Sequence, residues 1–348
     1  MLFSICIYTY NQIEILRKNI SEIVKYPGDD IEIVVSDNCS TDPIREMLLS
    51  FHDSRIKYYR TTENRGIDGN ILNALRCCKG EYIFLFRTKD QIIAEKIDDV
   101  LRTIKSHPSA AFFLFSAKDE QNKIRMKLKN KVFLQGRDAE TMHNKLLVHP
   151  SGQIYKRSCL RLELYEKYIN QYFSRPISSI VHQLIRMDLA EQGDFVTSSC
   201  MAWRYAYTMN TKEKAVYTTG SDISIYAPCH QYLMYQCEMD FVDREFSDNG
   251  AKNFLKILIE RYIRVVTVKF MYINRNEEMN AHYQTKSIAF HPYGELISFS
   301  KQTLMMIKRM KYENKSELRK WLVRQIYQVG LKEIPRMYLE QKKDKKAK

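Results

Sequence analysis

The chain has 348 residues, of which 45% are hydrophobic and 12% aromatic; this is enough for a large core and excludes a disordered chain. No apolar run reaches the roughly 18 to 20 residues that a membrane-spanning helix needs. The formal net charge is +14, and residues 301–348 alone hold 15 Lys and Arg against 5 Asp and Glu. Most of the excess positive charge is therefore near the end of the chain.

The cysteines and the amino terminus bear on the cellular compartment. None of the eight cysteines belongs to a CxxC pair, a spacing that suits neither a zinc site nor a disulfide framework. The first residues, MLFSICIYTYN, are apolar, with no basic segment before them and no small-residue cleavage site, so they do not resemble a signal peptide. We expect reduced thiols and a protein on the cytoplasmic side of the membrane.

Strands and helices are predicted to alternate over the first hundred residues. Apolar runs typical of buried strands occupy 3–10, 31–37, 55–61 and 82–86, and helical spacing of apolar residues occupies 11–26, 41–52 and 66–78. The helix at 41–52 opens with a Thr-Asp pair and Pro43, which is typical of a helix start. This alternation predicts right-handed βαβ units, an α/β fold class and a mainly parallel sheet covered on both faces.

The pattern loosens after residue 92. A helix is predicted at 93–108 and a strand at 110–118, followed by a charged connector and helical segments at 139–147 and 178–192. From about residue 222 long helical segments dominate, at 228–245, 250–274, 279–290 and 295–328. We therefore expect an α/β domain over residues 1–215 and a helical region over residues 216–348 with a basic amphipathic tail.

Polar residues follow each of the first four predicted strands, at 9–11, 36–42, 63–68 and 87–90. In an open α/β sheet, ligands bind beyond the carboxyl ends of the strands. The four loops are therefore expected to form one binding site.

Four sequence blocks then carry a family resemblance. SICIYTYNQ, IEIVVSDNCSTD, NRGIDGNILNAL and GEYIFLFRTKD, within residues 3–95, resemble in order and spacing the amino-terminal signature of family-2 glycosyltransferases of the GT-A fold. The usual pattern is S-I-x-I-P-T-Y-N, E-I-V-V-x-D-x-S-T-D, N-x-G followed by N, and G-E-Y-I-x-x-L-x-D-D-D. HPSGQIYKR at 149–157 and SSIVHQLIRMDLAEQG at 178–193 look like later blocks of an abequosyltransferase-like subgroup. The resemblance implies a Rossmann-like nucleotide-diphospho-sugar transferase fold and a glycosyltransferase.

The resemblance also implies roles in donor binding. Asp37 matches the carboxylate that binds the base or ribose of the donor, since a carboxylate accepts two hydrogen bonds; the alternative is that it caps the helix at 41–52. The other matched donor-binding residues are Thr9, Tyr10, Asn11, Asn64, Gly66, Asp68 and Asn70.

The stretch RTKD at 87–90 departs from the family pattern. Family members carry metal-binding carboxylates here, which hold Mg²⁺ or Mn²⁺ against the donor diphosphate, whereas this chain has Arg87 and Lys89 and keeps only Asp90. The two cations could neutralise the diphosphate themselves, or Asp90 could still hold a weakly bound metal. Cations beside a metal would repel it, which favours metal independence. A third interpretation is an inactive homologue that binds a nucleotide or a glycan.

The catalytic base and the acceptor pocket are also inferred from the resemblance. Inverting members place an Asp about eleven residues before a Gly that ends a helix, and this spacing before Gly193 reaches His182. An imidazole is suited to general-base catalysis at neutral pH, although His182 could equally be a structural helix residue. Asp188 and Asp119 are the alternatives for the base. His149, Ser151 and Gly152 are expected to shape the acceptor pocket, with Gly152 letting the backbone approach a sugar.

We expect an inverting enzyme that extends a lipid-linked oligosaccharide or polysaccharide. The segment 295–328 interleaves apolar and basic residues and contains Trp321, which is typical of a helix at an anionic membrane surface. It is equally typical of a helix packed on the protein with a solvated basic face. No pattern indicates nucleic-acid binding. The expected location is the inner face of the cell membrane, as a peripheral protein.

Overall fold

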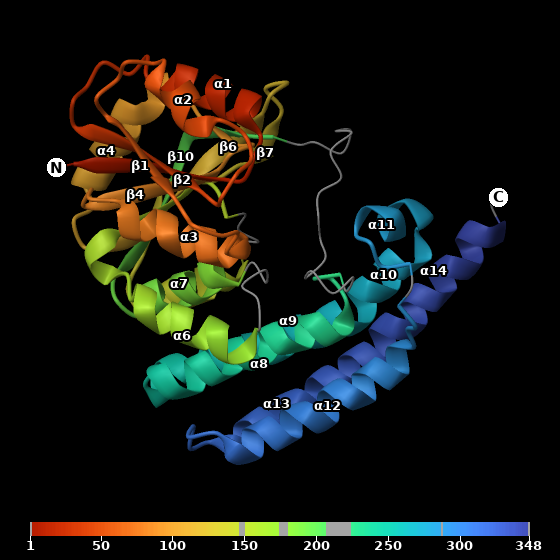
Figure 1. Cartoon of the computed structure of the whole chain (residues 1–348). Helices are drawn as coiled ribbons and strands as arrows, with labels where there is room; N and C mark the ends of the chain where they lie inside the picture. The colour runs from red at the N-terminus through yellow and green to blue at the C-terminus, as the bar shows by residue number, and fades with distance from the viewer. Residues whose placement is uncertain (1, 146–149, 174–179, 207–223, 287, 347–348) are drawn as a thin grey trace. The chain divides into compact units, whose positions relative to one another are not determined.

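The structure is a computed structural model that describes residues 2–145, 150–173, 180–206, 224–286 and 288–346 (Figure 1). Its contacts divide the chain into two compact units. The first unit is Met1–Asn170 with Ser174–Asn210, and the second is Gln171–Phe173 with Thr211–Lys348.

A mainly parallel sheet forms the centre of the first unit, as the sequence predicts. The strands lie in the order β3-β2-β1-β4-β9-β6-β10-β5, with β7 beside β6 and β8 beside β10. Strands β1 to β4 are parallel neighbours, while β9 runs antiparallel to both β4 and β6. The strands are β1 (Phe3–Thr9), β2 (Ile31–Asp37), β3 (Ile56–Arg60), β4 (Tyr82–Arg87), β5 (Gln91–Ile92), β6 (Ala110–Asp119), β7 (Ile124–Met126), β8 (Lys131–Phe133), β9 (Gln153–Lys156) and β10 (Asp194–Tyr205).

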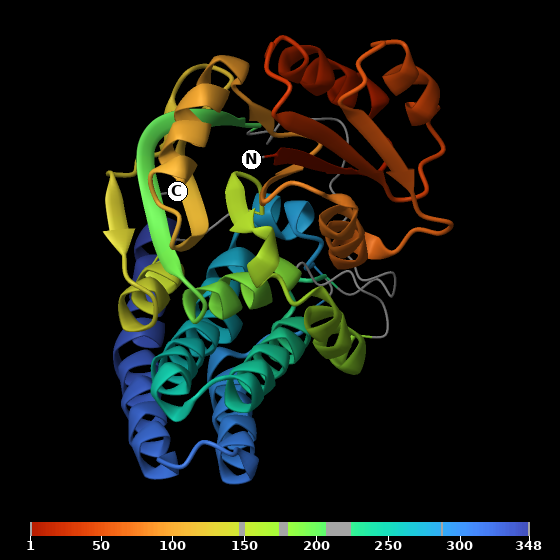
Figure 2. The same cartoon turned by 90° about the vertical axis from the view of Figure 1, so that its left-hand side faces the viewer.

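Helices cover both faces of this sheet (Figures 1 and 2). Because side chains alternate along a strand, Phe3, Ile5 and Ile7 of β1 point to the face covered by α1, α2 and α4, and this face holds a large apolar cluster. Helices α3 and α7 cover the other face (Figure 1). The helices of this unit are α1 (Ile13–Ile23), α2 (Ile44–Leu49), α3 (Gly66–Cys77), α4 (Ile97–Lys105), α5 (Arg137–Lys145), α6 (Leu162–Tyr172, whose last two residues belong to the second unit) and α7 (Val181–Ala190).

Two predictions in this unit need correction. The charged connector after β6 contains the short strands β7 and β8, and the strand β10 was not predicted. The Thr-Asp pair before Pro43 does not cap α2, which has no side-chain cap. Instead the carboxylate of Asp42 accepts a hydrogen bond from the backbone N–H of Ile13 at 3.1 Å, at the start of α1.

The second unit is helical. The described helices are α8 (Pro228–Glu245), α9 (Asp248–Arg264), α10 (Phe270–Arg275), α11 (Glu277–His282), α12 (Pro292–Arg309), α13 (Lys315–Gln328) and α14 (Ile334–Lys346), with π-helical turns at Val265–Lys269 and Val329–Glu333. The segment 295–328 is thus two helices, because Asn314 caps a new helix by accepting from the N–H of Glu317. The helix expected at 279–290 ends at His282. Over the described parts of the chain, no helix is both long enough and apolar enough to cross a membrane.

Candidate active site

The carboxyl ends of the first four strands meet at one edge of the sheet. The strand register places Thr9 beside Asp37 and Asp37 beside Arg60, and it places Tyr8 beside Arg87. The predicted loops after β1, β2, β3 and β4 therefore start from neighbouring positions. Arg60 was not predicted as a site residue; it lies within the strand predicted at 55–61 and is the last residue of β3 in the structure.

Asp37 is fully buried and holds its own loop in place. One carboxylate oxygen accepts the backbone N–H of Ser40 at 2.9 Å, and the other accepts the hydroxyl of Tyr58 at 2.7 Å. Burial, together with the hydrogen bond to Asp37, raises the pKa of Tyr58 to about 12. Binding of the sugar-nucleotide donor by Asp37 stays a prediction. In the structure, its carboxylate accepts hydrogen bonds that order the loop after β2.

The Tyr58 hydrogen bond gives a stability prediction. We expect Tyr58→Phe to lower the free energy of unfolding by about 1 to 3 kcal/mol, because it leaves a buried carboxylate oxygen without this donor. Tyr59→Phe on the same strand is the matched control, since among the described residues its hydroxyl has no hydrogen-bond partner. Urea unfolding measures both variants, and equal losses would show that the Asp37 contact contributes nothing specific.

Asparagine side chains tie the loops together. The amide of Asn70 donates to the carbonyl of Thr9 at 2.9 Å and accepts the hydroxyl of Ser36 at 2.8 Å, which links the ends of β1 and β2. Asn11 has a left-handed backbone (φ 56°), and its side-chain oxygen accepts from Thr41 N–H at 2.9 Å. The ends of β1 and β2 are thus held by polar side chains, as a binding edge requires.

Tyr10 is an exposed member of the predicted donor-binding residues, with 47% of its surface accessible. It lies between Thr9 and Asn11 at the end of β1. An exposed aromatic ring at this edge is available to contact a nucleoside.

The start of α3 connects this edge to α7. Asn64 accepts the N–H of Gly66 at 2.9 Å, and Gly66 has a positive φ of 69° that favours glycine. Asp68 is fully buried and accepts the backbone N–H of Val181, the first residue of α7, at 3.0 Å. The next residue is His182, which is 6% exposed. The predicted base therefore lies in the first turn of α7, and Asp68 of α3 anchors that turn.

The RTKD stretch forms an ion pair. The guanidinium of Arg87 donates through Nε to Asp90 Oδ2 at 2.6 Å and through Nη2 to Oδ1 at 3.2 Å. Burial lowers the pKa of Arg87, but the attraction of Asp90 outweighs this effect and the pKa ends above its usual value. The guanidinium also lies 5.4 Å from the ring centre of Tyr205, at the end of β10. Lys89 is half-buried.

The residues of this cluster do not fit a divalent cation. Both oxygens of Asp90 are engaged, since Oδ1 also accepts the N–H of Ala206 at 3.0 Å. The guanidinium of Arg87 contacts both oxygens of Asp90, so a metal ion bound by this carboxylate would lie beside a positive charge that repels it. In the described ranges, no group of three or more His, Cys, Asp or Glu side chains could hold a metal ion.

The acceptor residues have structural contacts of their own. The hydroxyl of Ser151 accepts the backbone N–H of Arg87 at 2.9 Å. Gly152 has a positive φ of 81°, and a Cβ there would come within 2.3 Å of the Trp203 ring. Gly152 thus permits a close approach of the backbone to Trp203. Their roles toward an acceptor stay predictions, and His149 lies outside the described residues.

The two alternatives for the base are engaged elsewhere. Asp188 is buried, forms an ion pair with Arg161 and accepts the hydroxyl of Tyr165 at 2.5 Å. Asp119 accepts the N–H groups of Gln121 and Lys123 in the turn after β6. Its pKa is lowered: burial raises it, but these N–H groups and Arg125 outweigh the burial. Both carboxylates have structural partners, and the role of His182 as the base stays a prediction.

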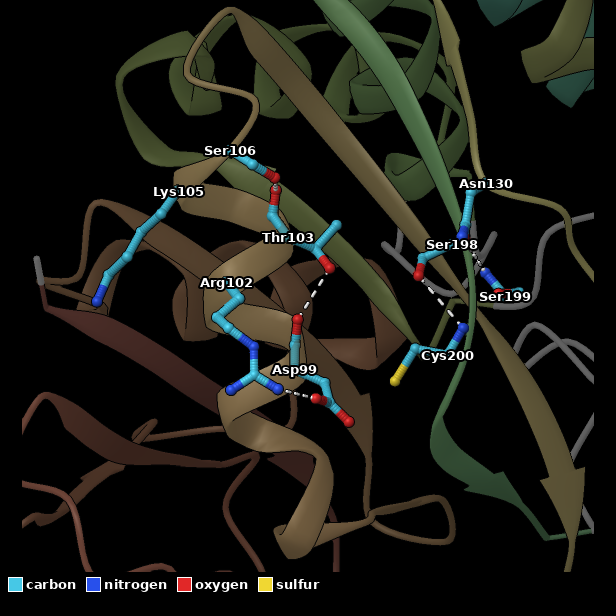
Figure 3. Close-up of a pocket in the computed structure, with 9 residues that line it drawn as sticks. All are labelled: Asp99, Arg102, Thr103, Lys105, Ser106, Asn130, Ser198, Ser199 and Cys200. Carbon is cyan, nitrogen blue, oxygen red and sulfur yellow. Dashed lines mark hydrogen bonds and ion pairs between the residues drawn. The ribbon is translucent and has the colours of Figure 1, made fainter.

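A surface hollow of about 740 Å³ lies away from these residues (Figure 3). It is bounded by α4 and by the bulge of β10 around Ser198 and Cys200. None of the predicted site residues lines it. The hollow therefore gives no support to the predicted donor site.

Comparison with known proteins agrees with the sequence blocks. Residues 4–162 match the model of glycosyl transferase family 2. Abequosyltransferase RfbV of Salmonella typhimurium is 34% identical over 102 residues, which is 28% of this chain and 31% of that protein. A glucosyltransferase of Escherichia coli, WfgD, which acts on α-D-GlcNAc-diphosphoundecaprenol with UDP-Glc, is 32% identical over 97 residues, or 28% of this chain and 38% of its own length. These alignments thus cover well under two thirds of either relative.

A solved structure extends the likeness in fold. The crystal structure of Staphylococcus aureus TarS residues 1–349 with UDP-GlcNAc superposes with a TM-score of 0.61 at 15% identity, covering 94% of this chain and 90% of that one. At this identity the likeness shows the fold alone. Residues 4–162 thus form a glycosyl transferase family 2 domain on a GT-A fold.

Proposed function

We propose that the protein is an inverting glycosyltransferase that moves a sugar from a nucleotide-sugar donor to a lipid-linked oligosaccharide or polysaccharide acceptor, in the biosynthesis of cell-surface polysaccharide. The match to family 2 supports the reaction class, and the lipid-linked acceptor of WfgD supports the acceptor class. The observation that carries the proposal is the row of polar residues along one edge of the sheet, from Asp37 to Arg87.

The donor lies over this edge in the proposal. Thr9, Tyr10, Asn11 and the loop after β2 contact the nucleoside, and the start of α3 lies beneath it. Arg87 contacts the diphosphate, because its Nη1 group has no partner among the described residues and is available to a phosphate oxygen. Arginine matches phosphate geometry through paired N–H groups.

The reaction is a direct displacement at the anomeric carbon. The acceptor hydroxyl attacks while His182 takes its proton, and the bond from the anomeric carbon to the diphosphate oxygen breaks with inversion. The departing diphosphate keeps the electron pair, and the positive charges of Arg87 and Lys89 stabilise it. No metal ion is required in this scheme, and Asp90 holds the guanidinium in place.

A second candidate is a catalytically inactive module that binds a nucleotide or a glycan. The engagement of both Asp90 oxygens by Arg87 and Ala206 favours it, because the carboxylate that family members use for metal is occupied. Sugar transfer in EDTA separates the two: the enzyme transfers sugar without metal, and the module does not transfer at all.

Calorimetry with UDP-, GDP-, CDP- and dTDP-sugars tests the proposal. We expect one nucleotide class to bind the full chain with unchanged affinity in EDTA. If none of the four sugar nucleotides binds, the proposed function is overturned. The acceptor is then sought with diphosphoundecaprenol-linked glycans.

The proposed setting is the inner face of the cell membrane. A lipid-linked acceptor is confined to a membrane surface, so an enzyme bound there meets it at a higher effective concentration. The net charge of +14 is compatible with anionic lipid.

A further inference from the structure

The α12–α13 hairpin buries one face within the helical unit. Phe299 of α12 lies between the rings of Tyr232 and Tyr235 of α8, with ring centres 5.6 and 4.8 Å away. In α13, the indole N–H of Trp321 donates to the carbonyl of Lys256 at 2.9 Å. Trp321 therefore contributes to the packing of α13 on α9, and it is not one of the exposed apolar residues of the hairpin.

The opposite face of the hairpin exposes large apolar side chains. Ile297, Val323 and Leu331 are 56%, 62% and 64% accessible. The exposed apolar residues recur about one or two helical turns apart, at 293, 297 and 304 in α12 and at 323 and 327 in α13. Met305 lies next to Leu304, and Leu331 lies in the π-helical turn after α13. We call this set, with the basic residues between its members, the outer face; its apolar members are Tyr293, Ile297, Leu304, Met305, Val323, Tyr327 and Leu331.

Cations occupy the remaining positions of the outer face. They are exposed and have no carboxylate partner within the described residues: Lys301, Lys308, Arg309, Lys320, Arg324 and Lys332. The carboxylates of these helices are used inside the unit. Glu317 pairs with Lys252 and Lys256, and Glu333 pairs with Arg264.

The turn that joins the two helices holds Glu313, and Glu295 is partly buried. Glu313 is exposed, but the other carboxylates from α12 to the π-helical turn after α13 are partly buried, and two of them pair with cations of α9. The six cations and the exposed apolar side chains face solvent. Such a surface combines the two attractions that bring a protein to anionic lipid, apolar insertion and charge.

We propose that the outer face docks on an anionic phospholipid surface. A second copy of the chain would bring the same unpaired cations against one another, which is repulsive. A nucleic acid would leave the aliphatic members Ile297, Leu304 and Leu331 without a partner, since aliphatic side chains do not stack on bases. The proposal rests on the proposed function only in that a lipid-linked acceptor gives the docking a use.

Vesicle co-sedimentation of the full chain tests the docking. We expect binding to phosphatidylcholine vesicles that contain about 30% phosphatidylglycerol, weaker binding at high salt, and little binding to phosphatidylcholine alone. Lys301→Glu with Lys320→Glu is expected to weaken binding by at least about tenfold. Ile297→Ser with Leu304→Ser is expected to weaken it also in low salt. Point variants are used and not a truncation before Phe299, because the truncation would remove the buried Phe299 from the packed interior of the helical unit.

Lys127→Glu with Lys129→Glu, two exposed cations of the first unit, is the matched control and should bind like the original chain. Equal losses in both charge variants, or equal binding to both vesicle types, would overturn the proposal. A dimer in light scattering that Ile297→Ser with Leu304→Ser converts to monomer would also overturn it, in favour of self-association. Donor-nucleotide calorimetry on the same samples shows that each variant is folded and separates a failure of docking from a failure of the proposed function.

Discussion

Replacement of His182 by Gln is expected to lower kcat by about 10²- to 10⁴-fold and to leave donor affinity unchanged. The imidazole takes the proton of the acceptor hydroxyl in the proposed reaction, and a side-chain amide cannot do so. The acid limb of the pH–rate profile should disappear with the imidazole. Initial rates with a lipid-linked acceptor, measured across pH, together with donor calorimetry, give both quantities.

His230→Gln supplies a control for burial. His230 is 6% exposed, as His182 is, but it lies in α8 of the helical unit, where burial lowers its pKa to about 4. This variant should keep its kcat even if its melting temperature falls. If His182→Gln keeps an unchanged kcat and pH profile, then His182 is a structural helix residue and the base lies elsewhere.

Removal of the Arg87 charge is expected to weaken diphosphate binding strongly. Arg87→Met alone would remove one cation of a buried ion pair and keep the carboxylate of Asp90, at a cost of about 3 to 5 kcal/mol. The informative variant is therefore Arg87→Met with Asp90→Asn, which removes both charges and keeps an acceptor for the N–H of Ala206. For this variant we expect kcat to fall by about 10²- to 10³-fold, as for the loss of a donor that stabilises developing negative charge.

Binding of the nucleoside separates this effect from misfolding. The double variant should bind the matching nucleoside, which lacks the diphosphate, as the original chain does, while the nucleoside diphosphate binds more weakly. Asp90→Asn alone serves as the matched control for the loss of the carboxylate. The proposal that Arg87 takes the place of a metal ion is refuted if EDTA abolishes donor binding by the original chain and Mn²⁺ restores it.

The early part of the fold follows from the sequence because of how its strands are buried. All residues of β1 and β2 are buried, so both strands appear as continuous apolar runs between helical patterns. Strand β10 was missed for a physical reason. Its register shifts between Ser198 and Trp203, and this bulge interrupts the alternation on which a strand prediction depends.

The helical region was predicted less well at its breaks. Apolar spacing continues from α12 into α13, so periodicity alone joins them. Besides the Asn314 cap, the break is stabilised by Asp243, which is far away in the sequence and whose carboxylate accepts the N–H groups of Lys311 and Tyr312. The spacing of apolar residues along the sequence does not indicate such a long-range contact.

The candidate site divides in the same way. The sequence located the polar residues at the strand ends, because the chain order of strands and loops is local information. It did not show that Asp37 binds Tyr58 or that Asp68 holds the start of α7, since these pairs are far apart in the sequence. Arg87 and Asp90 are close together in the sequence, and both were predicted as site residues. The sequence still did not show that the two side chains form an ion pair with each other.

That pair has a consequence for how the protein would respond to its surroundings. In the proposed metal-independent mechanism, the cation belongs to the polypeptide, has a fixed stoichiometry of one and cannot dissociate, so the proposed donor site is complete as soon as the chain has folded. Its occupancy would not follow the cell's supply of manganese or magnesium, and chelating agents or metal starvation would leave it intact. Regulation of the enzyme would then act on the supply of sugar nucleotide or of acceptor, and not on the availability of an ion.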